Sequence, residues 1–229
     1  MKILGIVAHA DDEISFAGLL RKVHVSGGQG MVICFTGDDV RKKEFMESCE
    51  ILGVKGVFLG YPDLGMHDLN YKELLVLLIK LIREFKPQVV ATMSISDYHP
   101  DHRKIVELTA DAVEFASHGT SDEGWMTKKV LMFESSNLLP QPDYLINIDD
   151  EMSCKMNALQ KYVSQLESPR KKGYYLAHTE KLAQLRGVMG GCQYAEACME
   201  FMMGKHGNFY CESKTINQVG GLLGAEDIL

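Results

Sequence analysis

Two short clusters of histidine and aspartate contain the residue types that hydrolytic chemistry uses. The first, HADDE at residues 9–13, follows the apolar run KILGIV, and the second, DYHPDH at residues 97–102, comes after the apolar run QVVATM. Catalytic zinc takes three nitrogen or oxygen ligands from the protein and keeps one position for water. We therefore expect a metal ion held by His9, Asp12 and His102.

Three neighbouring residues would turn a metal site into a hydrolytic one. Asp11 adjoins a ligand but points elsewhere on the turn, so we expect it to act as the base that takes a proton from water. His99 precedes His102 by three residues and, in its protonated form, would stabilise a developing oxyanion. Asp101 is expected to hold the His99 ring in orientation and to favour its cationic form.

Each residue also has a purely structural interpretation. Asp11 and Asp12 are of the type that is common at helix starts, and Glu13 is expected to be only a first-turn acid of this kind. A lone histidine near a strand end is more often a hydrogen-bonded structural residue than a ligand. However, both clusters follow predicted strands, and a structural interpretation would have to explain both at once. We favour the metal site.

Alternating apolar runs and helical patterns predict the elements that position the clusters. Strands are expected at residues 2–7, 31–35, 56–60, 88–93 and 130–133, with helices up to about residue 26 and at 42–52, 71–85 and 103–117. Further helices are expected near 150–167 and 179–190. This order predicts an α/β fold, a Rossmann-like three-layer αβα sandwich with a mostly parallel sheet and a C-terminal helical extension. If the first and fourth strands are neighbours, the two clusters meet at one sheet edge.

Composition and charge restrict the partners. A chain of 229 residues with 46% hydrophobic content is expected to form a single domain over residues 1–229. Its net charge of −7 disfavours nucleic acid. No apolar stretch is long enough for membrane insertion, and the N-terminus turns acidic too early for a signal peptide, so a cytoplasmic location is expected. The oligomeric state stays open, a homo-oligomer included.

Beyond the two clusters, several segments resemble the LmbE-like (PIG-L) family of N-acetylglucosaminyl deacetylases. The resemblance rests on AHADDE and HPDH, on TGDDVRKKE followed by ILGVKGVFLGYPDLGM, and on LRGVMGGCQYAEACMEF. It extends to a helix that contains Lys155, Ala158, Ser164 and Gln165, and so covers nearly the whole chain. Ala10 replaces the proline that is common in the family's first motif, where the side chain does no chemistry.

The resemblance implies the same metal ligands and the same roles for Asp11, His99 and Asp101, with one Zn²⁺ per chain and other divalent metals as alternatives. It adds Arg41 and Asp63 as residues that contact the sugar hydroxyls. The implied reaction is hydrolysis of the N-acetyl group of an N-acetylglucosamine-type sugar or conjugate, which releases acetate and a free amine. The group attached to the sugar is left open.

Other functions fit the sequence less well. The alternative on the same site is a metal-dependent amidase or deacetylase for another acylated small molecule, such as an antibiotic or thiol precursor. A dehydrogenase is disfavoured because no G-x-G-x-x-G follows the first strand, and a serine hydrolase because no G-x-S-x-G is present. A binding module with a structural zinc would need four protein ligands. In the segment 117–129, Trp125 is expected either to stack on a sugar ring or to pack.

Overall fold

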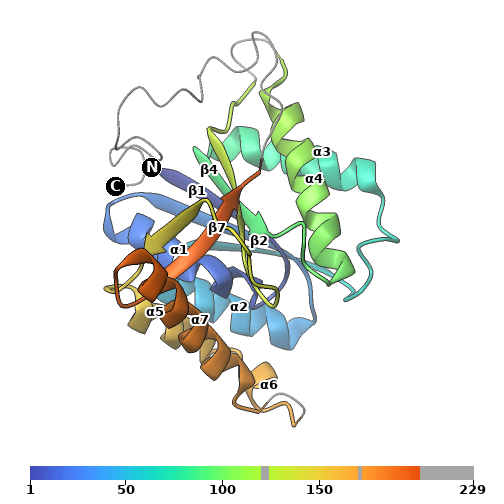
Figure 1. Cartoon of the computed structure of the whole chain (residues 1–229). Helices are drawn as coiled ribbons and strands as arrows, with labels where there is room; N and C mark the ends of the chain where they lie inside the picture. Colours follow the sequence, from blue (N-terminus) through green and yellow to red (C-terminus); the bar gives the residue numbers. More distant parts are fainter. Residues whose placement is uncertain (120–123, 170–171, 202–229) are drawn as a thin grey trace, which may run out of the picture.

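One seven-stranded sheet organises the protein (Figure 1). The computed structural model describes residues 1–119, 124–169 and 172–201. Along the chain, the strands are β1 (Lys2–His9), β2 (Gln29–Thr36), β3 (Lys55–Tyr61), β4 (Val89–Met93), β5 (Lys129–Phe133), β6 (Tyr144–Asn147) and β7 (Ala195–Glu200). Across the sheet, their order is β3-β2-β1-β4-β5-β7-β6. Strands β1 to β5 run parallel, whereas β7 is antiparallel to β5 and β6. The predicted pairing of the first and fourth strands is confirmed, since β1 pairs with β4.

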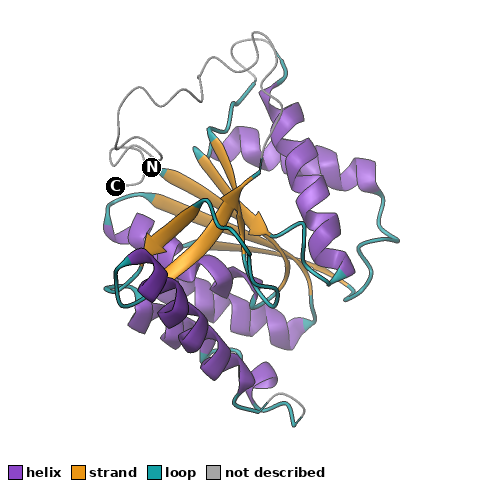
Figure 2. Ribbon diagram, in the orientation of Figure 1, coloured by secondary structure: helices purple, strands orange, loops and turns teal. Residues whose placement is uncertain are grey.

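Helices cover both faces of this sheet (Figure 2). One layer contains α1 (Ala17–Val25), α2 (Asp39–Leu52), α5 (Met152–Leu159), α6 (Val163–Leu166) and α7 (Tyr174–Gly190), and the other contains α3 (Tyr71–Phe85) and α4 (Pro100–Ser117). A 3-10 turn, η1 (Asp12–Phe16), links β1 to α1. The predicted three-layer α/β architecture is confirmed. No helix in the described ranges is long and apolar enough to cross a membrane.

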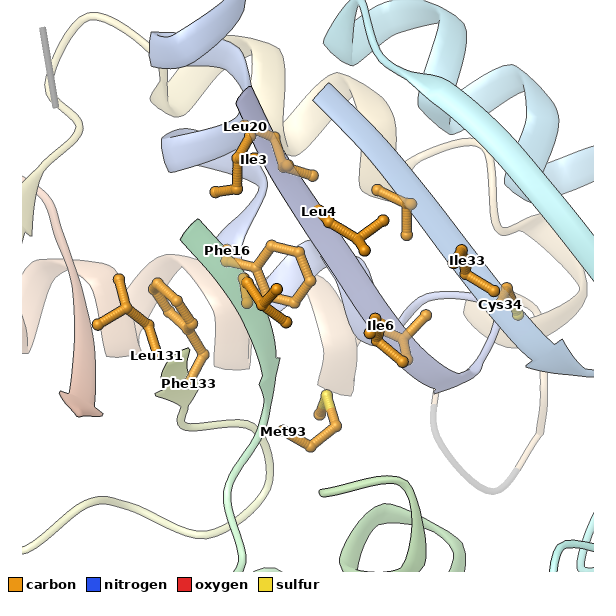
Figure 3. Packing of buried hydrophobic residues seen from close by; sticks show 14 of the residues in the cluster. Ile3, Leu4, Ile6, Phe16, Leu20, Ile33, Cys34, Met93, Leu131 and Phe133 are labelled. Carbon is orange, nitrogen blue, oxygen red and sulfur yellow. The ribbon is translucent and has the colours of Figure 1, made fainter. Parts of the chain in front are cut away.

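The central strands form because their apolar side chains are buried on both faces, as expected for a parallel sheet between helices. Ile3, Leu4 and Ile6 of β1 are fully buried, and the rings of Phe16 and Phe133 pack at a centroid distance of 5.3 Å (Figure 3). Side-chain caps stabilise the starts of α2, α3 and α4. At the start of α2, for example, the Asp38 carboxylate accepts a hydrogen bond of 2.9 Å from a backbone N–H of the first turn.

Helix α4 starts earlier than the sequence predicts, at Pro100 instead of about residue 103. His99 is its N-cap, with a ring nitrogen that accepts from the backbone N–H of Asp101, and proline suits the first helical position. The second cluster therefore occupies a loop and the first turn of a helix, and not a loop alone. The helical turn fixes the directions in which Asp101 and His102 point.

Two strands were not predicted from the sequence. Strand β6 precedes the helix expected at 150–167 and β7 follows the helix expected at 179–190, in stretches where neither a helix nor a strand was expected. The helix expected at 150–167 is divided into α5 and α6. The β7 sequence AEACME has no β-branched residue, so its local preference for a strand is weak. Pairing with β5 and β6 on either side supplies the missing stabilisation.

Candidate metal centre and active site

Two imidazole nitrogens and the two carboxylate oxygens of Asp12 converge where β1 ends and α4 begins. Nδ1 of His9 lies 3.1 Å from Nε2 of His102 and 3.3 Å from Oδ2 of Asp12, and His102 Nε2 lies 3.2 Å from Asp12 Oδ1. Ligands about 2.0–2.1 Å from a tetrahedral zinc ion are about 3.3 Å apart. The predicted ligands are therefore brought together with the spacing that such an ion requires.

Each histidine of this triangle presents its second nitrogen to a buried carboxylate. Nε2 of His9 lies 3.3 Å from Oδ2 of Asp101, and Nδ1 of His102 lies 3.2 Å from Oδ2 of Asp97. Both carboxylates are almost inaccessible, with exposed fractions of 0% for Asp101 and 2% for Asp97. Such carboxylates fix the tautomer of a metal-binding histidine and increase its basicity. The donor set therefore fits a divalent cation.

Two other groups of described residues also bring ligand atoms to within 4.8 Å of one another. One combines His9 and His102 with His99, and the other combines His9 with Asp63 and Asp101. In the triangle with Asp12, each residue has an atom within 3.3 Å of both of the others. This triangle also leaves Asp101 free to orient His9, whereas the second group would use the same carboxylate as a ligand. We therefore base the site on the triangle.

Charge stabilises protons on the triangle when no metal is bound. Burial opposes a charged ring at His9, but the hydrogen bond and charge of Asp12 raise the pKa of His9 to about 9. Burial is likewise outweighed at His102, where Asp12 and Asp97 raise the pKa to about 11. Burial also opposes the charge of Asp12, yet the two imidazoles hold its pKa well below the usual range. A divalent cation would thus replace protons beside a carboxylate that is already ionised.

Asp11 lies next to the triangle in a backbone conformation that non-glycine residues rarely adopt, with φ 98°. Its Oδ1 is 3.1 Å from Nη2 of Arg41, and the same guanidinium donates to the carbonyl of Ala10. Burial raises the pKa of Asp11 to about 7, against the opposing charge of Arg41. A carboxylate with a pKa near neutrality is well matched to proton transfer at neutral pH.

The structure corrects the expected relation between His99 and Asp101. The His99 ring lies close to the rings of both His9 and His102, at centroid distances of 4.6 and 4.8 Å. The Asp101 carboxylate, however, pairs with His9, and only its backbone N–H reaches His99. The charge of Asp101 favours the cationic form of His99, as expected, but burial and the positive charges of His9 and His102 outweigh it and lower the pKa of His99. Because its Nδ1 accepts a hydrogen bond, the neutral ring carries its proton on Nε2.

A cavity of about 810 Å³ opens onto these groups. Asp63 and Arg41 both line it. Asp63 is exposed and its Oδ1 lies 2.9 Å from Nε2 of His9, whereas Arg41 is largely buried with an Nη1 that has no hydrogen-bond partner among the described residues. Helix α7 contributes an aromatic part of the lining, where the rings of Tyr174 and His178 stack at 5.2 Å.

Trp125 does not line this cavity. Its indole N–H donates to the carbonyl of Pro87 at 2.7 Å, just before β4 begins. This places it at the edge of the sheet opposite to the metal centre. Of the two roles expected for Trp125, the structure therefore supports packing.

Three residues near the site were missed by the sequence analysis or given too small a role. Asp97 was noted only as part of its cluster, although it orients His102. Glu13 is no ordinary first-turn acid, because it is fully buried and accepts from the backbone N–H of Asp11. Tyr162, also fully buried, donates to Glu13 across 149 residues of sequence. No local pattern marks such a long-range contact.

Fold and site together define an α/β protein with a candidate hydrolytic metal centre at the carboxyl ends of β1 and β4. Residues 4–113 match the PIG-L family, described as GlcNAc-PI de-N-acetylase. The match contains both clusters of the metal centre and ends inside α4.

Individual proteins are similar to this chain over longer stretches than the family match. Diacetylchitobiose deacetylase of Thermococcus kodakarensis is 26% identical over 219 residues, which covers 85% of this chain and 81% of that protein. Mycothiol S-conjugate amidase of Streptomyces coelicolor is 26% identical over 155 residues, or 51% and 53% of the two chains. The crystal structure of GalB, a 4-carboxy-2-hydroxymuconate hydratase from Pseudomonas putida, superposes with a TM-score of 0.78 at 22% identity, and covers 90% of this chain and 98% of that one. This last likeness shows the fold alone.

Proposed function

We propose that this protein is a zinc-dependent deacetylase that hydrolyses the N-acetyl group of an N-acetylglucosamine-type sugar or conjugate. The observation that carries the proposal is the triangle of His9, Asp12 and His102 with the partly buried carboxylate of Asp11 beside it. The similarity to a diacetylchitobiose deacetylase over most of both chains supports an N-acetylated sugar as substrate.

Each residue of the site has its own role in this reaction. The triangle would hold the ion, and zinc, when bound, supplies a Lewis acid that polarises a carbonyl and lowers the pKa of water. Asp11, oriented by Arg41, takes a proton from the attacking water. His99 donates from Nε2–H to the acetyl oxygen as that oxygen becomes negative. Because His99 is neutral, Asp11 then delivers the proton to the departing nitrogen.

Zinc content and product release test the proposal together. We expect one zinc ion per chain by mass spectrometry, and equal amounts of acetate and amine from N-acetylglucosamine or N,N'-diacetylchitobiose. Asp11→Ala should retain zinc and lose about 10²–10⁴-fold in kcat, the usual contribution of a general base. Asp39→Ala, an exposed acid in the first turn of α2, is the matched control and should keep full activity. Full activity of zinc-loaded Asp11→Ala would overturn the assignment.

A second candidate is an amidase for a different acylated small molecule. The similarity to mycothiol S-conjugate amidase, over about half of each chain, favours this activity. The metal centre and the base would be the same, and only the group attached to the amide nitrogen would differ. Amine release from acylated thiol conjugates, measured beside the two N-acetylated sugars, separates the two candidates.

A further inference from the structure

A closed circuit of contacts surrounds Asp11. Its backbone N–H donates to Oε2 of Glu13 at 3.1 Å, and Oε1 of Glu13 accepts from the hydroxyl of Tyr162. The guanidinium of Arg41 lies over the Tyr162 ring, 5.4 Å from its centroid, and Nη2 of Arg41 returns to Oδ1 of Asp11 at 3.1 Å. Both the backbone and the carboxylate of Asp11 are thereby held by groups that connect through one tyrosine.

The members of this circuit that lie behind Asp11 are out of reach of a substrate. Glu13 and Tyr162 have exposed fractions of 0%, and neither side chain lines the cavity. Glu13 receives a further hydrogen bond of 2.7 Å from the Ser48 hydroxyl of α2. The carboxylate is therefore held on both oxygens, and it cannot leave the Asp11 N–H without breaking other buried hydrogen bonds.

Asp11 needs such support because of its backbone. A non-glycine residue at φ 98° is strained and persists in this state only where the surrounding structure holds it. A relaxed turn would redirect the side chain away from the triangle. Glu13 therefore accepts a hydrogen bond from the one residue of the site whose backbone conformation is unfavourable by itself.

Tyr162 brings a distant part of the chain into this arrangement. It lies between α5 and α6, outside residues 4–113, which are the residues that match the family. Helix α5 packs against α2, which carries both Arg41 and Ser48, and this packing sets the position of the tyrosine. The C-terminal region therefore shapes the surroundings of the base as well as completing the sheet.

We infer that Glu13 and Tyr162 are positioning residues for the base Asp11, Glu13 through the Asp11 N–H and Tyr162 through Glu13 and Arg41. The inference rests on the proposed function, in which Asp11 takes a proton from water. It differs from an ordinary stabilising role of two buried polar side chains, because a stabilising role affects the amount of folded protein and not the turnover of each folded, zinc-loaded molecule.

Tyr162→Phe is the decisive variant, since it keeps the ring beneath Arg41 and removes only the hydroxyl. At saturating N,N'-diacetylchitobiose we expect kcat per bound zinc to fall about tenfold, with KM within twofold of the wild type and one zinc per chain retained. Tyr144→Phe is the matched control: it removes a hydroxyl that donates to a carboxylate, Glu200, at 2.9 Å on the outer strands of the sheet. Its kcat per zinc should equal that of the wild type.

Two changes at Glu13 keep the test usable if Tyr162→Phe does not fold. Glu13→Gln keeps an oxygen for the Asp11 N–H but presents its amide N–H group to the Tyr162 hydroxyl, so its kcat should fall about as far as that of Tyr162→Phe. Glu13→Asp keeps the charge but is too short to reach both Asp11 and Tyr162, so its kcat should fall at least tenfold. An unchanged kcat per zinc in Tyr162→Phe or Glu13→Asp, or an effect on KM alone, would overturn the inference.

A structural readout distinguishes this inference from the proposed function. If the zinc-loaded wild type released no amine from any N-acetylated substrate, the proposed function would be overturned. A crystal structure of zinc-loaded Tyr162→Phe would then decide the inference. Separation of Asp11 from Arg41 supports positioning, and an unmoved Asp11 contradicts it.

Discussion

Nδ1 of His9 and Nε2 of His102 face each other at 3.1 Å, although 93 positions separate the two residues in the sequence. The parallel pairing of β1 with β4 explains the approach, because it places the ends of both strands at one edge of the sheet. Two imidazole nitrogens at this distance, with Asp12 beside both, share either protons or a cation.

Zinc binding should therefore release protons. Both histidines have pKa values above neutrality in the metal-free protein, about 9 for His9 and about 11 for His102, so they carry protons at pH 7 that a metal must displace. We expect one to two protons to leave per zinc ion, and the apparent affinity to rise about 10–100-fold per pH unit between pH 6 and 8. Calorimetric titrations in buffers of different ionisation enthalpy measure the proton count. A zinc affinity that does not change with pH would contradict this prediction.

The same protons should stabilise the metal-free fold. The unfolded pKa of histidine is about 6.5. A folded pKa raised to about 9 at His9 therefore contributes stability that is complete below about pH 6.5 and is lost as the pH rises through 9. Zinc should thus increase the melting temperature more at pH 8.5 than at pH 6.5, as measured by thermal unfolding with and without the metal. Equal increases at the two pH values would count against protonated histidines.

The carboxylates behind the two histidines should control metal affinity. Asp97→Asn and Asp101→Asn each replace a charged partner of a ligand, and changes of this kind typically weaken metal binding 10–100-fold. Competition with a chelator measures the zinc affinity, and Asp39→Asn on the surface serves as the control. An Asp101→Asn variant with unchanged zinc affinity would show that Asp101 does not act through His9.

The sequence is sufficient to predict the parts of the site that depend on sheet topology. The apolar runs of β1 and β4 are unambiguous, so the convergence of the two clusters that follow them is predictable. The partner of Asp101 is not, because it depends on where α4 begins and which way its first turn points. The role of Tyr162 is equally hard to predict from the sequence, because its contact with Glu13 exists only once α5 packs on α2. Strand β7 was missed because its pairing, and not its composition, makes it a strand.

A buried ion pair next to the cavity should dominate the stability of the C-terminal region. Nε and Nη2 of Arg186 lie 2.7 and 2.6 Å from the two carboxylate oxygens of Glu134, and both side chains are almost fully buried. Arg186→Met leaves a buried, unpaired carboxylate, which should reduce the free energy of unfolding by about 3–5 kcal/mol. The double variant Glu134→Gln/Arg186→Met should lose less than the sum of the single changes. Urea unfolding measures all three, and simple additivity would argue against a coupled pair.

The aromatic part of the cavity lining should recognise the portion of the substrate beyond the acetylated ring. Tyr174 is half exposed, lines the cavity and stacks with His178 on α7, so its ring face is available to a second sugar. Tyr174→Ala should raise KM for N,N'-diacetylchitobiose about 2–10-fold, which corresponds to about 0.5–1.5 kcal/mol for one aromatic contact. Turnover of free N-acetylglucosamine should not change. Val188→Ala, on the same helix with an exposed fraction of 80%, should alter neither. Equal losses on both sugars would show that Tyr174 supports the site as a whole and does not select a second ring.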